Sequence, residues 1–251
     1  DVSVQAVPKK ILVITQSRGF RHQPVNRKGQ DTCQVERILA KIGKESGVFT
    51  TVNSQDAIKS ITRENLKQFD GIFFYTTGML LPAGDPRDSL MDFIKSGKGF
   101  VGTHSAADTF KQYKGYVSMI NGSFAGHPWG SGGKWPFVVE DSKHPVNKAF
   151  KDKTFQFSDE IYQYKGYDRS KLRVLVGLDA VKTGKKGNSK TNDYPVSWVR
   201  SYGKGRIFYS NFGHNKATWW TPYILQHFLD GIQWALGDIE GPSDSLPQPK
   251  Y

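Results

Sequence analysis

The chain has 251 residues, of which 37% are hydrophobic, and this length and composition predict one folded domain with a sizeable core. No apolar run approaches the ~20 residues that span a bilayer, so an integral membrane protein is excluded, and the single cysteine, Cys33, excludes an intramolecular disulfide. The formal net charge of +12 is spread along the chain, and its densest run, at 182–190, is rich in Gly and Ser, which indicates a solvated loop rather than a nucleic-acid surface.

The first half of the chain alternates strands with helices. Continuous apolar runs at 10–15, 71–75 and 99–102 predict strands buried on both faces of a parallel sheet, and a short strand is expected at 48–52. Apolar residues at helical spacing predict two helices between them, at Val35, Ile38, Leu39 and Ile42 and at Leu90, Phe93 and Ile94. This order predicts a mostly parallel sheet with helices on both faces.

The second half is richer in strands and less regular. Strands are predicted at Phe137–Val139, Phe155–Phe157, Arg173–Val176, Val196–Val199 and Arg206–Tyr209. The connections between the last of them are too short for a crossover helix, so some pairs should be antiparallel. A closing helix carries Ile224, Phe228, Ile232 and Leu236, and the tail from Gly241 should be extended.

The most informative segment is Gly99–Asp108, which indicates a buried strand, a tight turn and a helix, with His104 at the turn. In α/β folds such a corner often carries the chemistry. An imidazole titrates near neutrality and is the commonest metal ligand. The structural alternative is that Thr103–Ser105 only caps the following helix through a hydroxyl.

Other polar residues also follow predicted strands. His22 comes after the first strand and His214 after the last, and because loops after the carboxyl ends of parallel strands share one edge of a sheet, both should converge with His104. Second-half loops supply His127 and Glu160 as further candidates. His144 and His227 are expected to be structural.

Several short motifs together resemble one known family. They are GFRH, GTHSAADTF, GHPW, DEIYQY, PVSWVR, YGKGRIFYSNFGHN and HFLDGIQWALGD. In this succession the chain resembles the ThuA-like (trehalose-utilisation) family from about residue 10 to 238, leaving 1–9 and 239–251 as extended terminal segments. The resemblance implies a flavodoxin-like fold of the class I glutamine amidotransferase type, and a role in bacterial carbohydrate utilisation beside oxidoreductases that make keto-sugars.

The comparison with amidotransferases disfavours glutamine hydrolysis. Those enzymes carry a cysteine at the elbow, where this chain has His104, and Cys33 belongs to the first helix. A thioester mechanism needs a nucleophilic thiolate at that corner.

Two uses of the histidine and carboxylate set remain open. In one, His22, His104 and His214, with Glu160 or Asp108, bind a divalent metal such as zinc that polarises a keto-sugar oxygen. In the other, His104, Asp108 and Glu160 act without metal as general acids and bases. The spacing of these residues does not decide between them.

Aromatic residues beside the polar motifs favour a carbohydrate ligand, because their rings offer apolar faces to sugar rings. They are Trp129, Trp135, Trp219, Trp220, Tyr162 and Tyr164. With His127, the substrate-binding candidates are Trp129, Tyr162 and Trp219, whereas Trp198 and Trp234 should be core residues. The chain has no GxGxxG after the first strand and no Walker motif, so no nucleotide cofactor is expected.

These observations predict a periplasmic or secreted bacterial enzyme that acts on a sugar or keto-glycoside by hydrolysis or elimination. The alternative is a carbohydrate-binding protein that holds a sugar at the same residues without turning it over.

Overall fold

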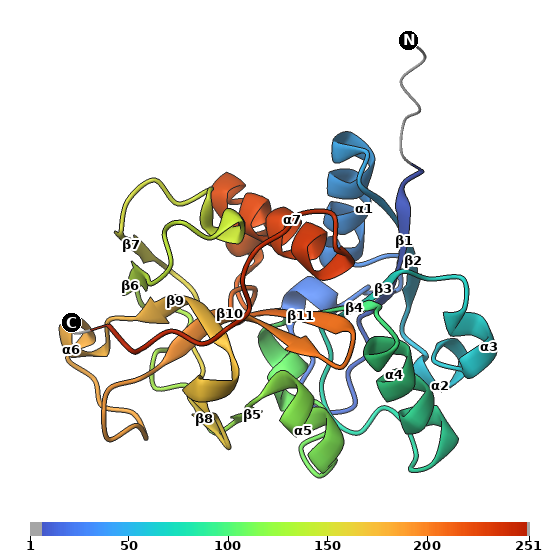
Figure 1. Cartoon of the computed structure of the whole chain (residues 1–251), viewed down its shortest axis with the longest axis horizontal. Helices are drawn as coiled ribbons and strands as arrows, with labels where there is room; N and C mark the ends of the chain where they lie inside the picture. The colour runs from blue at the N-terminus through green and yellow to red at the C-terminus, as the bar shows by residue number, and fades with distance from the viewer. Residues whose placement is uncertain (1–6, 250–251) are drawn as a thin grey trace.

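A nine-stranded mixed sheet forms the centre of the computed structural model, which describes residues 7–249 (Figure 1). Its strand order is β2-β1-β3-β4-β11-β10-β9-β6-β7. The strands are β1 (Lys9–Ile14), β2 (Phe49–Ser54), β3 (Gly71–Phe74), β4 (Gly99–Thr103), β6 (Trp135–Val139), β7 (Thr154–Phe157), β9 (Arg173–Leu178), β10 (Pro195–Tyr202) and β11 (Gly205–Ser210). A separate pair is formed by β5 (Ser123–Phe124) and β8 (Tyr164–Lys165).

The predicted parallel core is confirmed. β1, β3 and β4 are parallel neighbours inside the sheet, β2 continues the parallel set at one edge, and β11 pairs in parallel with β4. From β11 onward the pairs β11-β10, β10-β9, β9-β6 and β6-β7 are antiparallel. The short connections between the last strands had predicted that some of these pairs would be antiparallel. The fold is therefore α/β and flavodoxin-like, with a β-rich second half.

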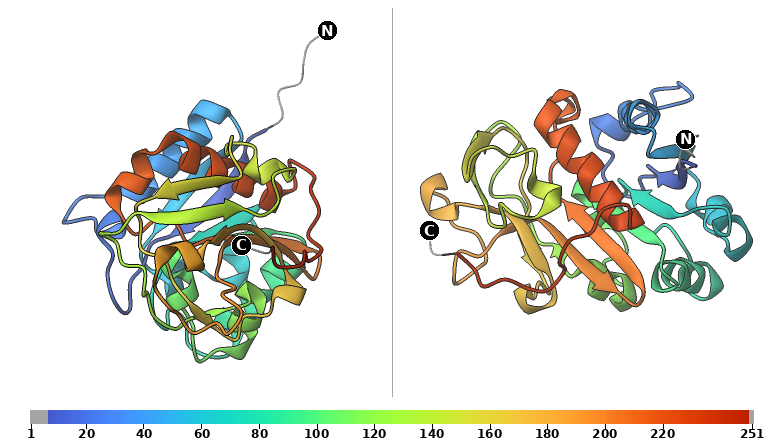
Figure 2. Two further views of the ribbon diagram at one scale, coloured as in Figure 1. Left: turned by 90° about the vertical axis from the view of Figure 1, so that its left-hand side faces the viewer. Right: turned by 45° about the horizontal axis from the view of Figure 1, so that its top comes forward.

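Helices cover both faces of the sheet, as Figures 1 and 2 show. The α-helices are α1 (Gln34–Ser46), α2 (Ala57–Ser60), α3 (Arg63–Leu66), α4 (Asp85–Lys95), α5 (Lys114–Ile120), α6 (Ala180–Thr183) and α7 (Pro222–Leu236). Side chains of β1 alternate between the two faces: Ile11 and Val13 join the core under α1 and α7, whereas Leu12 and Ile14 join the core under α4 and α5. This alternation explains why the whole run is apolar.

Short 3₁₀ helices were not expected from the sequence and fill several connections. They are η1 (Gln23–Val25), η2 (His104–Asp108), η3 (Pro145–Asn147), η4 (Arg169–Lys171) and η5 (Lys216–Trp220). The helix after the His104 corner is thus η2, and the next α-helix begins only at Lys114. The capping alternative also fails, because the Thr103 hydroxyl donates to the carbonyl of Phe212 instead of capping η2.

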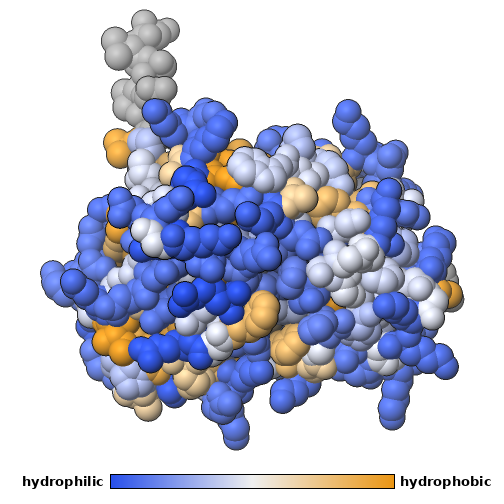
Figure 3. Space-filling model, turned by 180° about the vertical axis from the view of Figure 1, so that it is seen from behind, coloured by the Kyte–Doolittle hydropathy of each residue, from blue (hydrophilic) through white to orange (hydrophobic). Residues whose placement is uncertain are grey.

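The tail runs without regular structure over the second half of the sheet. Its carbonyls at Gly241 and Asp244 accept hydrogen bonds from Trp234 and Arg173. No helix in residues 7–249 is long and apolar enough to cross a membrane. Figure 3 shows that hydrophilic residues dominate one face, with apolar residues in small separate groups.

Candidate functional site

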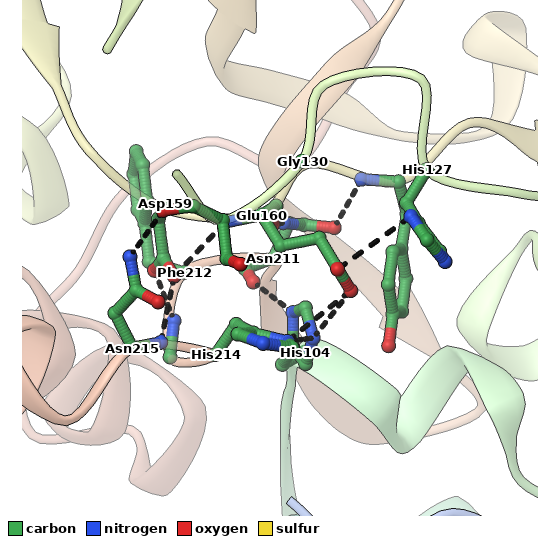
Figure 4. Close-up of polar contacts among 12 residues, drawn as sticks. His104, His127, Gly130, Asp159, Glu160, Asn211, Phe212, His214 and Asn215 are labelled. Atoms are coloured by element: carbon green, nitrogen blue, oxygen red, sulfur yellow. Dashed lines mark hydrogen bonds and ion pairs between the residues drawn. The ribbon is translucent and has the colours of Figure 1, made fainter. Parts of the chain in front are cut away.

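Four side chains from distant parts of the chain meet at the carboxyl edge of the parallel strands. One ligand atom from each of His22, His104, Glu160 and His214 lies within 4.8 Å of the other three. We call these four residues the histidine–glutamate group. Figure 4 shows His104, Glu160 and His214 turned toward one another. His22 follows β1, His104 follows β4 and His214 follows β11, so the three loops share one edge of the sheet.

The His104 corner is a strained elbow. His104 has a φ of +44°, in the left-handed region that non-glycine residues avoid and that recurs at functional sites. Two residues earlier, a Cβ on Gly102 would lie 3.1 Å from the Cβ of Ala106. The close approach of strand and turn therefore favours a glycine at 102, and this sharp turn places the imidazole at the edge of the sheet.

One hydrogen bond fixes the tautomer of His104. Its Nδ1 lies 2.8 Å from the carbonyl oxygen of Asn211, and because a carbonyl can only accept, Nδ1 carries the proton. Nε2 is left with its lone pair facing the group, 3.2 Å from Nδ1 of His214 and 3.6 Å from Oε1 of Glu160. A backbone carbonyl that orients an imidazole in this way is typical of metal-binding histidines.

Asn211 joins the elbow to the segment that carries Glu160. Its Nδ2 donates to the backbone carbonyl of Glu160 at 2.7 Å, and its Oδ1 accepts from the amide of Tyr162 and the hydroxyl of Tyr164, each at 3.0 Å. This residue is fully buried. Asn211 was not predicted from the sequence, although a polar residue shortly after a predicted strand was an available signal.

Asp159 holds the loop that presents His214. Its carboxylate accepts from the amides of Gly213 and Asn215 and from the hydroxyl of Thr218, at 2.7 to 2.9 Å. Burial raises the pKa of Asp159, although these hydrogen bonds oppose the shift. Asp159 is fully buried and was also missed, because it acts on the site through backbone amides that no pattern encodes.

The charge states suit cation binding. Burial, followed by the nearby His104 and His214, lowers the pKa of His22 to about 2, so its imidazole is neutral. Burial alone would raise the pKa of Glu160, but the neighbouring imidazoles of His104 and His214 outweigh it and hold that pKa well below its usual range. The histidine–glutamate group therefore combines a carboxylate with neutral imidazole.

The donor set fits a divalent transition metal. The buried Nδ1 of His22 has no hydrogen-bond partner among the described residues, and leaving such an atom unpaired costs free energy. Imidazole and carboxylate together suit zinc and similar ions. The residues present therefore match the metal-binding alternative that the sequence left open.

His127 lies beside the group, whereas Asp108 is not part of it. The side chain of His127 is 53% exposed, and its Nδ1 lies 3.5 Å from Oε2 of Glu160. Asp108 forms an ion pair with Lys111 at 2.6 Å instead and is outside the histidine–glutamate group. Asp108, the carboxylate nearest to His104 in sequence, is thus paired with Lys111, and the carboxylate of the histidine–glutamate group comes from Glu160.

The aromatic candidates divide by burial. Tyr162 is 3% exposed and packs with its ring centroid 4.2 Å from that of His104. Trp129 and Trp219 are fully buried, and their indole N–H groups donate to the hydroxyl of Thr183 and the carbonyl of Gly213. Neither indole face is open to a sugar, so the structure places both tryptophans in the core rather than at a binding surface.

His144 and His227 lie in the core, apart from the histidine–glutamate group. His227 is fully buried between Ser197 and the carbonyl of Val146. His144 is buried beside the tail, with Nε2 3.1 Å from the carbonyl of Pro242.

The buried imidazole of His22 predicts an acid-sensitive fold. In the unfolded chain His22 is protonated below its ordinary pKa of 6.5. In the folded chain its pKa is about 2, so it stays neutral through this range. The free energy of unfolding of metal-free protein should therefore decrease below pH 6.5, by up to about 1.4 kcal/mol per pH unit from this residue. Urea unfolding between pH 7.5 and 4.5 measures the slope. His22→Asn should reduce it, and an unchanged slope would contradict the assignment.

Comparisons with known proteins agree with this fold. The family model described as ThuA, trehalose utilisation, matches residues 10–235. No curated protein sequence matches. A ThuA-like protein from Bacteroides uniformis is similar in structure, with a TM-score of 0.74 at 21% identity, covering 92% of each chain. One from Parabacteroides merdae has a TM-score of 0.71 at 18% identity and covers 97% of this chain and 94% of its own. A cytoplasmic protein from Salmonella typhimurium has a TM-score of 0.59 at 12% identity, covering 90% of this chain and 98% of its own.

Proposed function

Because the chain belongs to the ThuA (trehalose utilisation) family, we propose that it is a metal-dependent enzyme that cleaves an oxidised, keto-glycoside. The observation that supports this proposal most directly is the histidine–glutamate group, with ligand atoms within 4.8 Å of one another. The packing of a protein core does not require three imidazoles and one carboxylate to lie together at the edge of a sheet, so a ligand for them is expected. An oxidised sugar supplies the carbonyl on which such a site acts.

The position of that carbonyl follows from the chemistry of the cleaved bond. A carbonyl acidifies hydrogens on the adjacent carbon, and a substituent one carbon further on can then leave. For the leaving group to be the glycosidic oxygen on carbon 1, the acidic hydrogen must be on carbon 2 and the carbonyl on carbon 3. The proposed substrate class is therefore a pyranoside oxidised at carbon 3.

The residues of the site have two roles, metal binding and proton transfer. His22, His104, His214 and Glu160 would hold the ion, which as a Lewis acid would polarise the substrate carbonyl. Nδ1 of His127 faces the second oxygen of Glu160, an arrangement that directs Nε2 of His127 outward as a base. We assign to His127 Nε2 the removal of the proton from carbon 2. As the bond from carbon 1 to oxygen breaks, the same imidazole returns the proton to the departing oxygen.

Removing the metal is expected to abolish turnover. Purified protein should contain about one zinc or similar ion, and dialysis against a chelator should stop the release of methanol from a methyl glucoside oxidised at carbon 3. Readdition should restore it. An ion present at about 1,000 times its dissociation constant adds about 4 kcal/mol of stability, so the melting temperature should rise by about 10 °C. Mass spectrometry of metals, calorimetry and product detection measure the three effects.

The unoxidised glucoside is the matched control, because it lacks the carbonyl and should not be cleaved. Turnover that survives complete metal removal would contradict metal dependence and favour direct acid–base catalysis. Sugar binding with no turnover of either glucoside would show a carbohydrate-binding protein instead.

A further inference from the structure

An aromatic ring stands exposed beside the histidine–glutamate group. The large hydrophobic side chains that are exposed in residues 7–249 are Val7, Phe20, Val52, Ile58, Val181 and Trp220. Among them, Phe20 alone has a ring packed against a member of the group: its centroid lies 4.8 Å from that of His22, at an angle of 77°. The Phe20 residue is 67% exposed. Core packing does not account for this ring.

The backbone that carries Phe20 is fixed. The amide of Arg18 donates to the carbonyl of Thr77 at 2.9 Å, and the amide of Gly19 donates to the Thr77 hydroxyl at 3.1 Å. That hydroxyl donates in turn to the carbonyl of Phe20 at 2.9 Å. Thr77 is itself buried and follows β3. The exposed ring is therefore held by a rigid part of the sheet edge rather than by a loose loop.

Polar atoms beside the same group complete a surface suited to a sugar. The side chains of His127 and His214 are 53% and 22% exposed, and each has its Nδ1 directed to Glu160. Their Nε2 atoms make no hydrogen bond to the part of the chain that the structure describes. A pyranose ring of glucose configuration has axial C–H bonds on its faces and hydroxyls around its rim. Its face suits an aromatic ring, and its rim suits imidazole nitrogens.

We propose that Phe20 is the platform on which the pyranose ring of the substrate stacks, which makes it a specificity-determining residue for glucose-configured sugars. This inference rests on the proposed function, since the stacked ring must present its carbonyl to the histidine–glutamate group. Stacking is made in the ground state and the transition state alike. Loss of the ring should therefore raise KM and leave kcat unchanged.

The test compares three variants of the full chain, Phe20→Ala, Phe20→Tyr and Trp220→Ala. Saturation-transfer NMR and calorimetry with trehalose and methyl glucoside measure binding without requiring turnover. We expect Phe20→Ala to weaken binding and to raise KM for the oxidised methyl glucoside about tenfold. Phe20→Tyr keeps an aromatic face and should bind like the wild type. Trp220→Ala removes the other large aromatic side chain that is exposed in residues 7–249, and it should change neither quantity.

Metal content separates this proposal from the proposed function. All three variants should retain the ion, since none removes a ligand. A wild type that binds no sugar, or a Phe20→Ala variant with wild-type affinity, would overturn the platform. An equal loss in Trp220→Ala would do the same. Normal sugar binding that depends on Phe20, in a protein that holds no metal and cleaves no glucoside, would support the platform and contradict the proposed function.

Discussion

Replacing His104 by asparagine is expected to lower kcat/KM for the oxidised glucoside by about 10³-fold or more, the range found for positioned acid–base and ligand groups. Nε2 of His104 lies 3.2 Å from Nδ1 of His214 and 3.6 Å from Oε1 of Glu160. Loss of the imidazole therefore removes the central ligand atom of the histidine–glutamate group. Asparagine is chosen because it tolerates the φ of +44° at this elbow. Activity assays and thermal melts of the same preparation measure the effect.

An alanine variant at this position separates chemistry from stability. His104→Ala leaves the buried carbonyl of Asn211 without the imidazole donor, at a cost of about 1–3 kcal/mol, and should melt at a lower temperature while remaining folded. Full activity in a folded His104→Asn protein would show that the chemistry lies elsewhere.

Cys33→Ser is the matched control and should leave activity unchanged. Cys33 is buried, and burial raises the pKa of its thiol to about 11, so it carries no thiolate at neutral pH. It lies at the N-cap of α1, a position where serine is well tolerated. Loss of activity in a folded Cys33→Ser protein would indicate that the Cys33 thiol takes part in the reaction, contrary to the prediction made from His104 at the elbow.

The sheet could be predicted from the sequence because its strands are short apolar runs with clear ends. Residues 10–15 and 71–75 are apolar nearly throughout, which is diagnostic of strands covered on both faces. Once the parallel order is known, the convergence of His22, His104 and His214 follows from topology. The position after a strand determines the edge at which a side chain lies, whatever its distance along the chain.

The rest of the site depends on contacts that no local pattern records. Glu160 reaches the group because Asn211 holds its backbone carbonyl, and His214 is presented by the bonds of Asp159 to the following loop. Asp108 is nearer to His104 in sequence, yet it pairs with Lys111. Burial likewise separates Trp219 from Trp220, which are adjacent in sequence: the first is fully buried and the second is 68% exposed.

Replacing Glu160 by glutamine should weaken metal binding and lower kcat/KM by about 10²-fold or more. Glutamine has the same shape and keeps the backbone carbonyl that accepts from Asn211, so the segment should remain in place. What is lost is the negative charge, which Oε1 presents to His104 and His214 and Oε2 to His127. Calorimetric metal titration and steady-state kinetics measure the two effects, with Glu45→Gln, an exposed carboxylate on α1, as the matched control.

The stability of the metal-free variant gives an independent check on the same charge. Although burial opposes the shift, the neighbouring imidazoles of His104 and His214 hold the pKa of Glu160 below its ordinary value of 4.5. A carboxyl with a depressed pKa in the folded state contributes stability above its unfolded pKa and loses it as the pH falls through the folded value. Glu160→Gln should therefore be less stable than the wild type at pH 7, and the difference should shrink below about pH 4.5. If the variant binds metal normally but does not turn over, Glu160 acts on the proton held by His127 rather than as a ligand. If both properties survive, the carboxylate has no part in the reaction.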